Sequence, residues 1–109
     1  GRHEYLLSFE GAWLDYPFGE EVAVYKVGHK GVPGQDEKMF ALVAEGASPL
    51  RVSVKCDPQL AVLLREKYET VVPGHHLNKK HWNTLICSGQ LDDEEIKDFV
   101  RLSYRLVTE

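Results

Sequence analysis

One stretch of the chain, residues 50–56 (LRVSVKC), constrains the fold more than any other because its side chains alternate between apolar and polar. A period of two residues places the apolar side chains on one face of a strand and the polar ones on the other. We therefore expect a half-buried strand in an antiparallel sheet. A helix start follows directly, because Asp57 can cap a helix whose first residue is Pro58.

The residues before this strand predict one helix and two further strands. Residues 2–10 carry aromatic and apolar side chains at helical spacing, and the helix is expected to end at Gly11. Residues 22–27 and 38–45 are rich in β-branched and apolar side chains, which is typical of strands. The intervening residues 28–37 contain three glycines and a proline, and we expect an exposed loop there.

The helix that begins at Pro58 is expected to pack one face inward and to leave the opposite face in water. The residues predicted to face inward are Leu60, Leu63, Leu64, Lys67 and Tyr68. Arg65 and Glu66 are predicted to face water. Two short strands are expected to follow, the second over residues 81–87.

The last helix has the clearest start of any element, because Asp92 and Glu95 have the spacing of a capping box. Its predicted core stripe consists of Ile96, Phe99, Val100, Ser103 and Val107. Together the elements predict an α+β two-layer sandwich, with helices on one face of a largely antiparallel sheet. A chain of 109 residues is long enough for one such domain, and we expect a single domain over residues 1–109.

The acidic net charge speaks against an evenly basic nucleic-acid-binding protein. The chain has 13 basic and 17 acidic side chains, which gives a formal charge of −4. The charge is distributed unevenly, because residues 51–88 hold six basic and three acidic side chains. This local excess of positive charge can attract a phosphate-bearing partner over roughly 8–10 Å.

The two cysteines, Cys56 and Cys87, are too few for a disulfide framework, and no secretory signal or membrane-length apolar run is visible. We therefore expect a reduced, cytoplasmic protein with no membrane segment, and a monomer by default. The sequence begins with Gly1 and not with methionine, so we expect upstream residues or a cloning remnant.

Five segments carry a resemblance to a known family. They are residues 73–84 (PGHHLNKKHWNT), 15–19 (DYPFG), 38–41 (KMFA), 55–58 (KCDP) and 103–104 (SY). Over essentially its whole length the chain resembles the MmcQ/YjbR family of small bacterial proteins. This resemblance implies a fold similar to the CyaY-like sandwich of frataxin. It also implies a proposed role in DNA binding, and iron handling does not follow from the fold.

The densest polar motif, HLNKKHWN, with the histidine before it, is the first candidate site. Lysines can neutralise phosphates, asparagine amides can bond to phosphates or base edges, and an aromatic ring can stack. Histidines add further hydrogen-bond donors. The candidate nucleic-acid-binding residues are Lys55, His75, His76, Asn78, Lys79, Lys80, His81, Trp82 and Asn83. The partner would be DNA, bound weakly and in a salt-dependent way.

A structural interpretation of the same motif is equally open. In that interpretation Trp82 belongs to the core, the two lysines are solvated, and the asparagine and histidine side chains satisfy backbone groups of an irregular connection. A second functional hypothesis is a cleft between the DYPFG and HLNKKHWN segments, lined by Tyr16, Phe18 and Trp82. Such a cleft would bind a small planar or anionic ligand, or a protein. Tyr16 and Phe18 can also simply cover one edge of the sheet.

Metal binding and catalysis are not expected. The histidines of the motif and Cys87 match no common zinc spacing, so we predict no metal and no cofactor. Cys56 lies on the apolar face of its strand. His81 and Cys87 would lie about 20 Å apart on an extended strand, which is too far for a nucleophile and its base. His75 or His76 could still approach Cys87 from the neighbouring strand, but we predict no catalytic residues and no enzyme.

Overall fold

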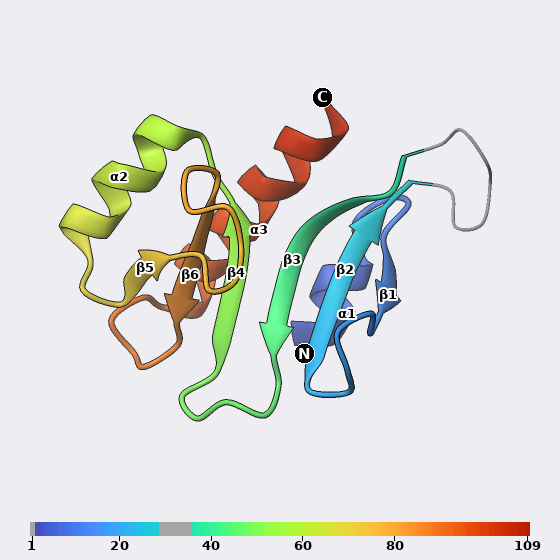
Figure 1. The fold of residues 1–109 in the computed structure, drawn as a ribbon, viewed down its shortest axis with the longest axis horizontal. Helices are drawn as coiled ribbons and strands as arrows, with labels where there is room; N and C mark the ends of the chain where they lie inside the picture. The colour runs from blue at the N-terminus through green and yellow to red at the C-terminus, as the bar shows by residue number, and fades with distance from the viewer. Residues whose placement is uncertain (1, 29–35) are drawn as a thin grey trace.

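A computed structural model describes residues 2–28 and 36–109. In this part of the chain an open, antiparallel sheet of six strands has the order β1-β2-β3-β4-β6-β5 (Figure 1). The elements in chain order are α1 (Arg2–Leu7), β1 (Trp13–Asp15), β2 (Val22–Val27), β3 (Lys38–Ala44), β4 (Arg51–Lys55), α2 (Pro58–Lys67), β5 (Val71–Pro73), β6 (Trp82–Ile86) and α3 (Asp93–Thr108). The predicted α+β class is therefore confirmed. Most of the loop predicted at 28–37 lies outside the described residues, and within them no helix is long and apolar enough to cross a membrane.

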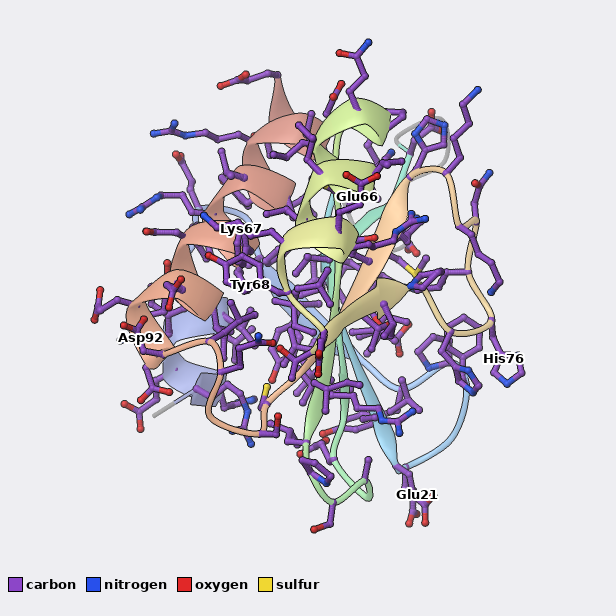
Figure 2. The ribbon with its side chains drawn as sticks, turned by 90° about the vertical axis from the view of Figure 1, so that its left-hand side faces the viewer. Glu21, Glu66, Lys67, Tyr68, His76 and Asp92 are labelled. Carbon is purple, nitrogen blue, oxygen red and sulfur yellow. The ribbon has the colours of Figure 1, made fainter. Side chains whose placement is uncertain are left out.

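The main hydrophobic core lies between the sheet and the helices. Phe40 on β3, Val52 on β4 and Leu85 on β6 are at most 1% exposed, and they form one cluster with Leu6 of α1 and Val100 of α3. In Figure 2 the sheet is seen from the side, with α1 and α3 to its left. We call this side of the sheet the helix-covered face.

The opposite side of the sheet is covered in part by the connection between β5 and β6, residues 74–81, which we call the 74–81 loop. Val24, Leu42 and Trp82 form a second buried cluster there, and Leu77 of the loop packs against it. In Figure 2 the loop, with His76, lies on the other side of the sheet from Asp92 at the start of α3. We call this side the loop-covered face.

Strand β4 confirms the alternation that was read from its sequence, with one difference. Val52 and Val54 face the main core, and Cys56 just after the strand is also buried. Ser53 on the other face is only 8% exposed, and a 2.8 Å hydrogen bond to the hydroxyl of Thr84 on β6 satisfies its buried hydroxyl. The polar face of β4 is thus buried at its centre, where the sequence predicted an exposed face.

Helix α2 begins as predicted but faces differently. The Asp57 side chain accepts hydrogen bonds from the backbone amides of Gln59 and Leu60, which confirms the cap. Leu63, predicted to face inward, is 59% exposed, whereas Ala61 is fully buried. The reason is that α2 packs mainly against β5 and β6 at one end of the sheet, so the stripe it buries is narrow.

The N-terminal residues also differ from the prediction. Helix α1 ends at Leu7, before Gly11, which adopts a positive φ of 77°. Residues 13–15, which were not predicted as a strand, form the edge strand β1 against β2. The Nζ atom of Lys26 on β2 donates to carboxylates of Asp15 and Glu37 at 3.0 and 3.3 Å. Burial lowers the pKa of this lysine, but the two hydrogen bonds outweigh burial and leave the pKa raised.

Helix α3 has the predicted capping box, with hydrogen bonds in both directions between Asp92 and Glu95. Ser103 in its core stripe is fully buried. The Ser103 hydroxyl donates to the carbonyl of Phe40 on β3 at 2.6 Å and accepts from the amide of Lys55 at 2.8 Å. The Ser103 side chain therefore joins α3 to β3 and to the end of β4, and it provides a hydrogen-bond partner for the amide of Lys55.

Candidate functional site

The 74–81 loop is held in place mainly by its own backbone and by β6. The amide of Gly74 donates to the carbonyl of Trp82 at 2.9 Å, and the Asn78 carbonyl accepts from the amides of His81 and Trp82. A Cβ atom on Gly74 would lie 2.7 Å from the Cβ of Trp82, so the close approach needs glycine. The loop is therefore a defined turn structure on the loop-covered face.

Trp82 and Asn83, both predicted to contact a nucleic acid, are turned into the protein. Trp82 is 8% exposed and belongs to the second buried cluster, so it has no free ring face for stacking. Asn83 is 1% exposed. Its amide group donates to the carbonyl of Ala61 at 3.2 Å, and its Oδ1 atom accepts from Nε of Arg65 at 2.7 Å. For these two residues the structural interpretation holds.

Arg65 has a role that the sequence did not indicate. Its guanidinium was predicted to face water, but it is half-buried and bonds both to Asn83 and to the carbonyl of Lys79. Lys79 also donates from Nζ to the carbonyl of Gly74 at 3.0 Å. Helix α2, strand β6 and the 74–81 loop are thus joined through one polar network.

The other predicted residues remain near the surface. His75, His76, Asn78, Lys79 and Lys80 are exposed, and Lys55 and His81 are half-buried. The Asn78 Oδ1 atom accepts from the amide of Lys80 at 2.9 Å and so stabilises the turn.

The rings of His75 and His76 lie with their centroids 3.9 Å apart. His76 has a φ of 58°, in the left-handed region that non-glycine residues rarely adopt. The backbone amide of His75 donates to the Thr84 hydroxyl at 3.2 Å. The pair is therefore tied to β6 through the backbone, while both rings stay at the surface.

A hollow of about 200 Å³ lies on the loop-covered face, between the DYPFG segment and the 74–81 loop. We call it the Phe18 hollow. The lining residues are Phe18, Val22, Leu42, Ala44, Arg51, Ser53, His75, His76, Leu77 and Thr84. Phe18 of the DYPFG segment and residues of the 74–81 loop thus line the same hollow.

The other two residues predicted for this cleft do not line the hollow. The hydroxyl of Tyr16 donates to the Glu45 carboxylate at 3.0 Å, and this bond raises the pKa of the tyrosine. Trp82 belongs to the second buried cluster and does not line the hollow. Leu42, a member of the same cluster, does line it. Arg51 is one of several lining residues that the sequence did not indicate, although its place on the polar face of β4 could have indicated it.

The described residues contain no group of three or more metal-binding side chains placed to hold an ion. Both cysteines are free thiols. Burial raises the pKa of Cys56 and of Cys87, which disfavours the nucleophilic thiolate in each case.

Comparison with known proteins now identifies the family. The YjbR family model matches residues 7–106. The chain belongs to the YjbR family. The resemblance predicted from the five sequence segments is confirmed.

Two relatives with similar sequences are both named as uncharacterised proteins. The Escherichia coli O157:H7 protein YbdF is 31% identical over 96 residues, which cover 88% of this chain and 72% of YbdF. The uncharacterised protein YjbR of Escherichia coli K12 is 41% identical over 70 residues. That match covers 64% of this chain and 59% of YjbR, so it spans less than two thirds of YjbR.

Two solved structures share the fold. Deinococcus radiodurans protein DR2400, a DUF419 protein, superposes with a TM-score of 0.90 at 34% identity, over 99% of this chain and 76% of DR2400. A Pseudomonas syringae protein, structural genomics target PsR293, gives a TM-score of 0.73 at 27% identity, over 94% of this chain and 92% of the target. These matches support the architecture described above.

Proposed function

We propose that this protein is a small-ligand-binding module and that its site is the Phe18 hollow. The ligand class is a small molecule with an apolar body and one anionic group. One observation carries the proposal: Phe18 of the DYPFG segment and the stretch His75–Leu77 of the 74–81 loop line one and the same hollow.

The floor of the hollow favours an apolar body. Val22, Leu42, Ala44 and Leu77 contribute aliphatic side chains, and Phe18 is 63% exposed beside them. A volume of about 200 Å³ corresponds to roughly seven water molecules at about 30 Å³ each. The space suits one aromatic ring or a short alkyl chain, whose transfer from water is favourable.

The polar groups around the floor favour an anion. Arg51 supplies a permanent positive charge, and His75 and His76 supply ring nitrogens. Among the described residues that line the hollow, none carries a carboxylate. The hydroxyls of Ser53 and Thr84 are already bonded to each other, so the guanidinium of Arg51 is the partner for a ligand carboxylate.

The test is a calorimetric titration of the 109-residue chain with 4-phenylbutyrate and with its neutral amide. We expect the carboxylate to bind about fivefold more tightly, because an exposed charge pair contributes up to about 1 kcal/mol. Arg51→Gln should remove this preference. Arg105→Gln, which removes an exposed cation from α3, is the matched control and should preserve it. Equal binding of both probes to the unmodified chain would contradict the proposal.

A second candidate, weak DNA binding, is favoured by one observation. Lys79 and Lys80 are exposed on the same loop as His75 and His76, within the basic part of the sequence. Each phosphate contact would make binding salt-dependent. This candidate ranks lower because two of its nine residues are buried and the Lys79 ammonium is bonded within the loop.

A further inference from the structure

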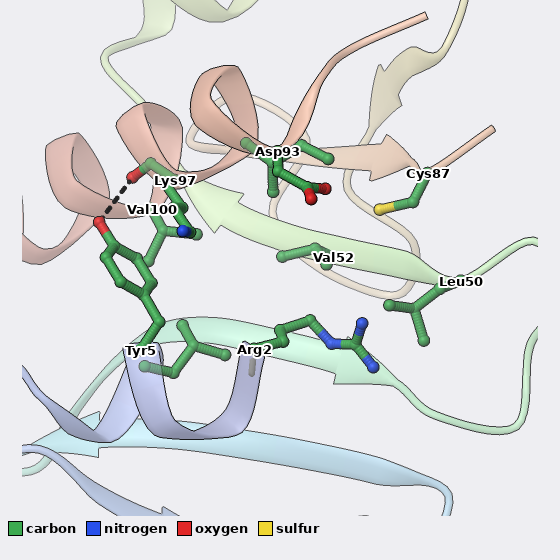
Figure 3. A pocket seen from close by; sticks show the side chains of 10 residues that line it. Arg2, Tyr5, Leu50, Val52, Cys87, Asp93, Lys97 and Val100 are labelled. Carbon is green, nitrogen blue, oxygen red and sulfur yellow. Dashed lines mark hydrogen bonds between the residues drawn. The ribbon is translucent and has the colours of Figure 1, made fainter. Parts of the chain in front are cut away.

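A second cavity lies on the helix-covered face, between α1 and the first half of α3 and over β4 (Figure 3). We call it the α1–α3 pocket. Its volume is about 320 Å³, which lies at the lower end of the range for small-molecule sites. It shares no residue with the Phe18 hollow, because the two cavities open on opposite faces of the sheet.

The base of the pocket is apolar and rigid. Leu6, Val52 and Val100 line it, each at most 3% exposed and part of the main core. Tyr5 closes one end, because its hydroxyl donates to the carbonyl of Lys97 at 3.2 Å (Figure 3). Cys87, which is half-buried, lies at the other end. A ligand entering the pocket would therefore cover aliphatic surface without a rearrangement of the backbone.

Two opposite charges face this apolar base from different walls. Figure 3 shows the Arg2 guanidinium on the α1 side and the Asp93 carboxylate on the α3 side, with Val52 between them. Within residues 2–28 and 36–109, neither side chain forms an ion pair or a hydrogen bond. Both act on the same thiol: burial raises the pKa of Cys87, Arg2 lowers it and Asp93 raises it further.

The third charged group of the lining is already engaged. The Nζ atom of Lys97 lies 3.8 Å from the Glu94 carboxylate and 5.3 Å from the centre of the Tyr5 ring. The charges available to a ligand are therefore one cation and one anion. A ligand with a single anionic group would be attracted by Arg2 but repelled by Asp93. A simple amine would be attracted by Asp93 but repelled by Arg2.

From this arrangement we infer that the α1–α3 pocket binds an apolar α-amino acid in its zwitterionic form. The carboxylate would pair with Arg2 and the ammonium with Asp93, while the side chain would lie on Val52 and its neighbours. The volume equals roughly ten water molecules at about 30 Å³ each, which accommodates an amino acid of the size of leucine or phenylalanine.

The experiment is an NMR titration of the 109-residue chain with L-phenylalanine, 3-phenylpropionate and 2-phenylethylamine. The last two probes each carry one of the two charges. We expect L-phenylalanine to bind at least threefold more tightly than either, with shift changes at Leu6, Val52 and Val100. An L-phenylalanine affinity no better than that of 3-phenylpropionate, or shift changes confined to other residues, would overturn the inference. Changes near Phe18 would report the other hollow, so the two proposals fail separately.

Two variants separate the charge pairing from helix stability. Asp93→Asn should bring the affinities of L-phenylalanine and 3-phenylpropionate to within twofold of each other. Asp98→Asn removes the same charge from the same helix, and neither Asp98 nor its partner Arg101 lines the pocket, so this variant should leave the preference intact. If both variants lose the preference equally, the pocket assignment is wrong.

Alkylation of the thiol gives an independent readout. Cys87 lines the pocket and Cys56 does not. Saturating L-phenylalanine should slow the reaction of Cys87 with N-ethylmaleimide severalfold, measured by mass spectrometry of the peptide. An unchanged rate at saturation would contradict occupancy of this pocket.

Discussion

The two faces of the sheet are covered by different means. The helix-covered face is buried by side chains of whole helices, with a continuous apolar core that reaches from Leu6 to Val107. On the loop-covered face the described residues form a cluster of three buried hydrophobic side chains, and its cover is a loop held by backbone and side-chain hydrogen bonds. Many polar residues of the family motif are thus needed to hold the loop, and fewer are available to contact a partner.

The largest expected effect tests the helix-covered face. Phe40 is completely buried, and its ring contacts those of Phe9 and Tyr104 at centroid distances of 5.7 and 5.4 Å. Phe40→Ala should lower the free energy of unfolding by about 3–5 kcal/mol, because it removes apolar contacts and leaves a cavity. Urea denaturation measures the change. A loss below 1 kcal/mol would show that this face is not the main source of stability.

The next effect tests the polar network that joins helix α2 to strand β6 and to the 74–81 loop. Asn83→Ala removes the acceptor of the Arg65 Nε–H and the side-chain donor to the Ala61 carbonyl, and should lower the free energy of unfolding by about 2–3 kcal/mol. Asn78→Ala is the control within the same motif. Its side chain accepts one bond at the surface, so about 0.5–1 kcal/mol is expected. Equal losses for both asparagines would contradict the structural role assigned to Asn83.

A smaller effect separates two adjacent lysines. Lys79 donates to the Gly74 carbonyl, so Lys79→Ala should cost about 0.5–1 kcal/mol. Lys80→Ala should stay within about 0.5 kcal/mol of the unmodified chain, since its side chain is exposed. Thermal unfolding of the two variants measures the difference. A larger loss of stability for Lys80→Ala than for Lys79→Ala would contradict the stabilising role assigned to the hydrogen bond between Lys79 and Gly74.

The smallest expected effect concerns DNA. If the second candidate function holds, the affinity for duplex DNA falls as salt rises, and Lys79→Ala with Lys80→Ala flattens that slope by roughly 0.9 for each lost phosphate contact. Fluorescence anisotropy at several salt concentrations measures the slope. Binding that ignores salt, or that survives the double substitution unchanged, would remove DNA from consideration.

Sequence reasoning worked where the determinants are local. Asp57 with Pro58, and Asp92 with Glu95, define helix starts within four residues, and both were predicted correctly. Strand β1 was missed because three residues carry too little periodicity, and it is defined by its pairing with β2.

The site was harder to predict, because the same side chain can serve two purposes. An asparagine amide bonds equally well to a base edge or to a backbone carbonyl, and only the position of α2 shows that Asn83 does the latter. The orientation of Arg65 depends on which strands α2 meets, which periodicity does not specify. Phe18 lines the hollow, whereas Tyr16, also named for the cleft, donates its hydroxyl to Glu45, which is distant in sequence.

The most direct test of the proposed function is a map of where 4-phenylbutyrate binds. Backbone amide shifts of the isotope-labelled 109-residue chain would be followed as the probe is added. We predict saturable changes centred on Val22, Leu42, Leu77 and Thr84, the residues around the Phe18 hollow. Changes absent from these four residues, or scattered without saturation, would contradict the assignment of this hollow as the binding site.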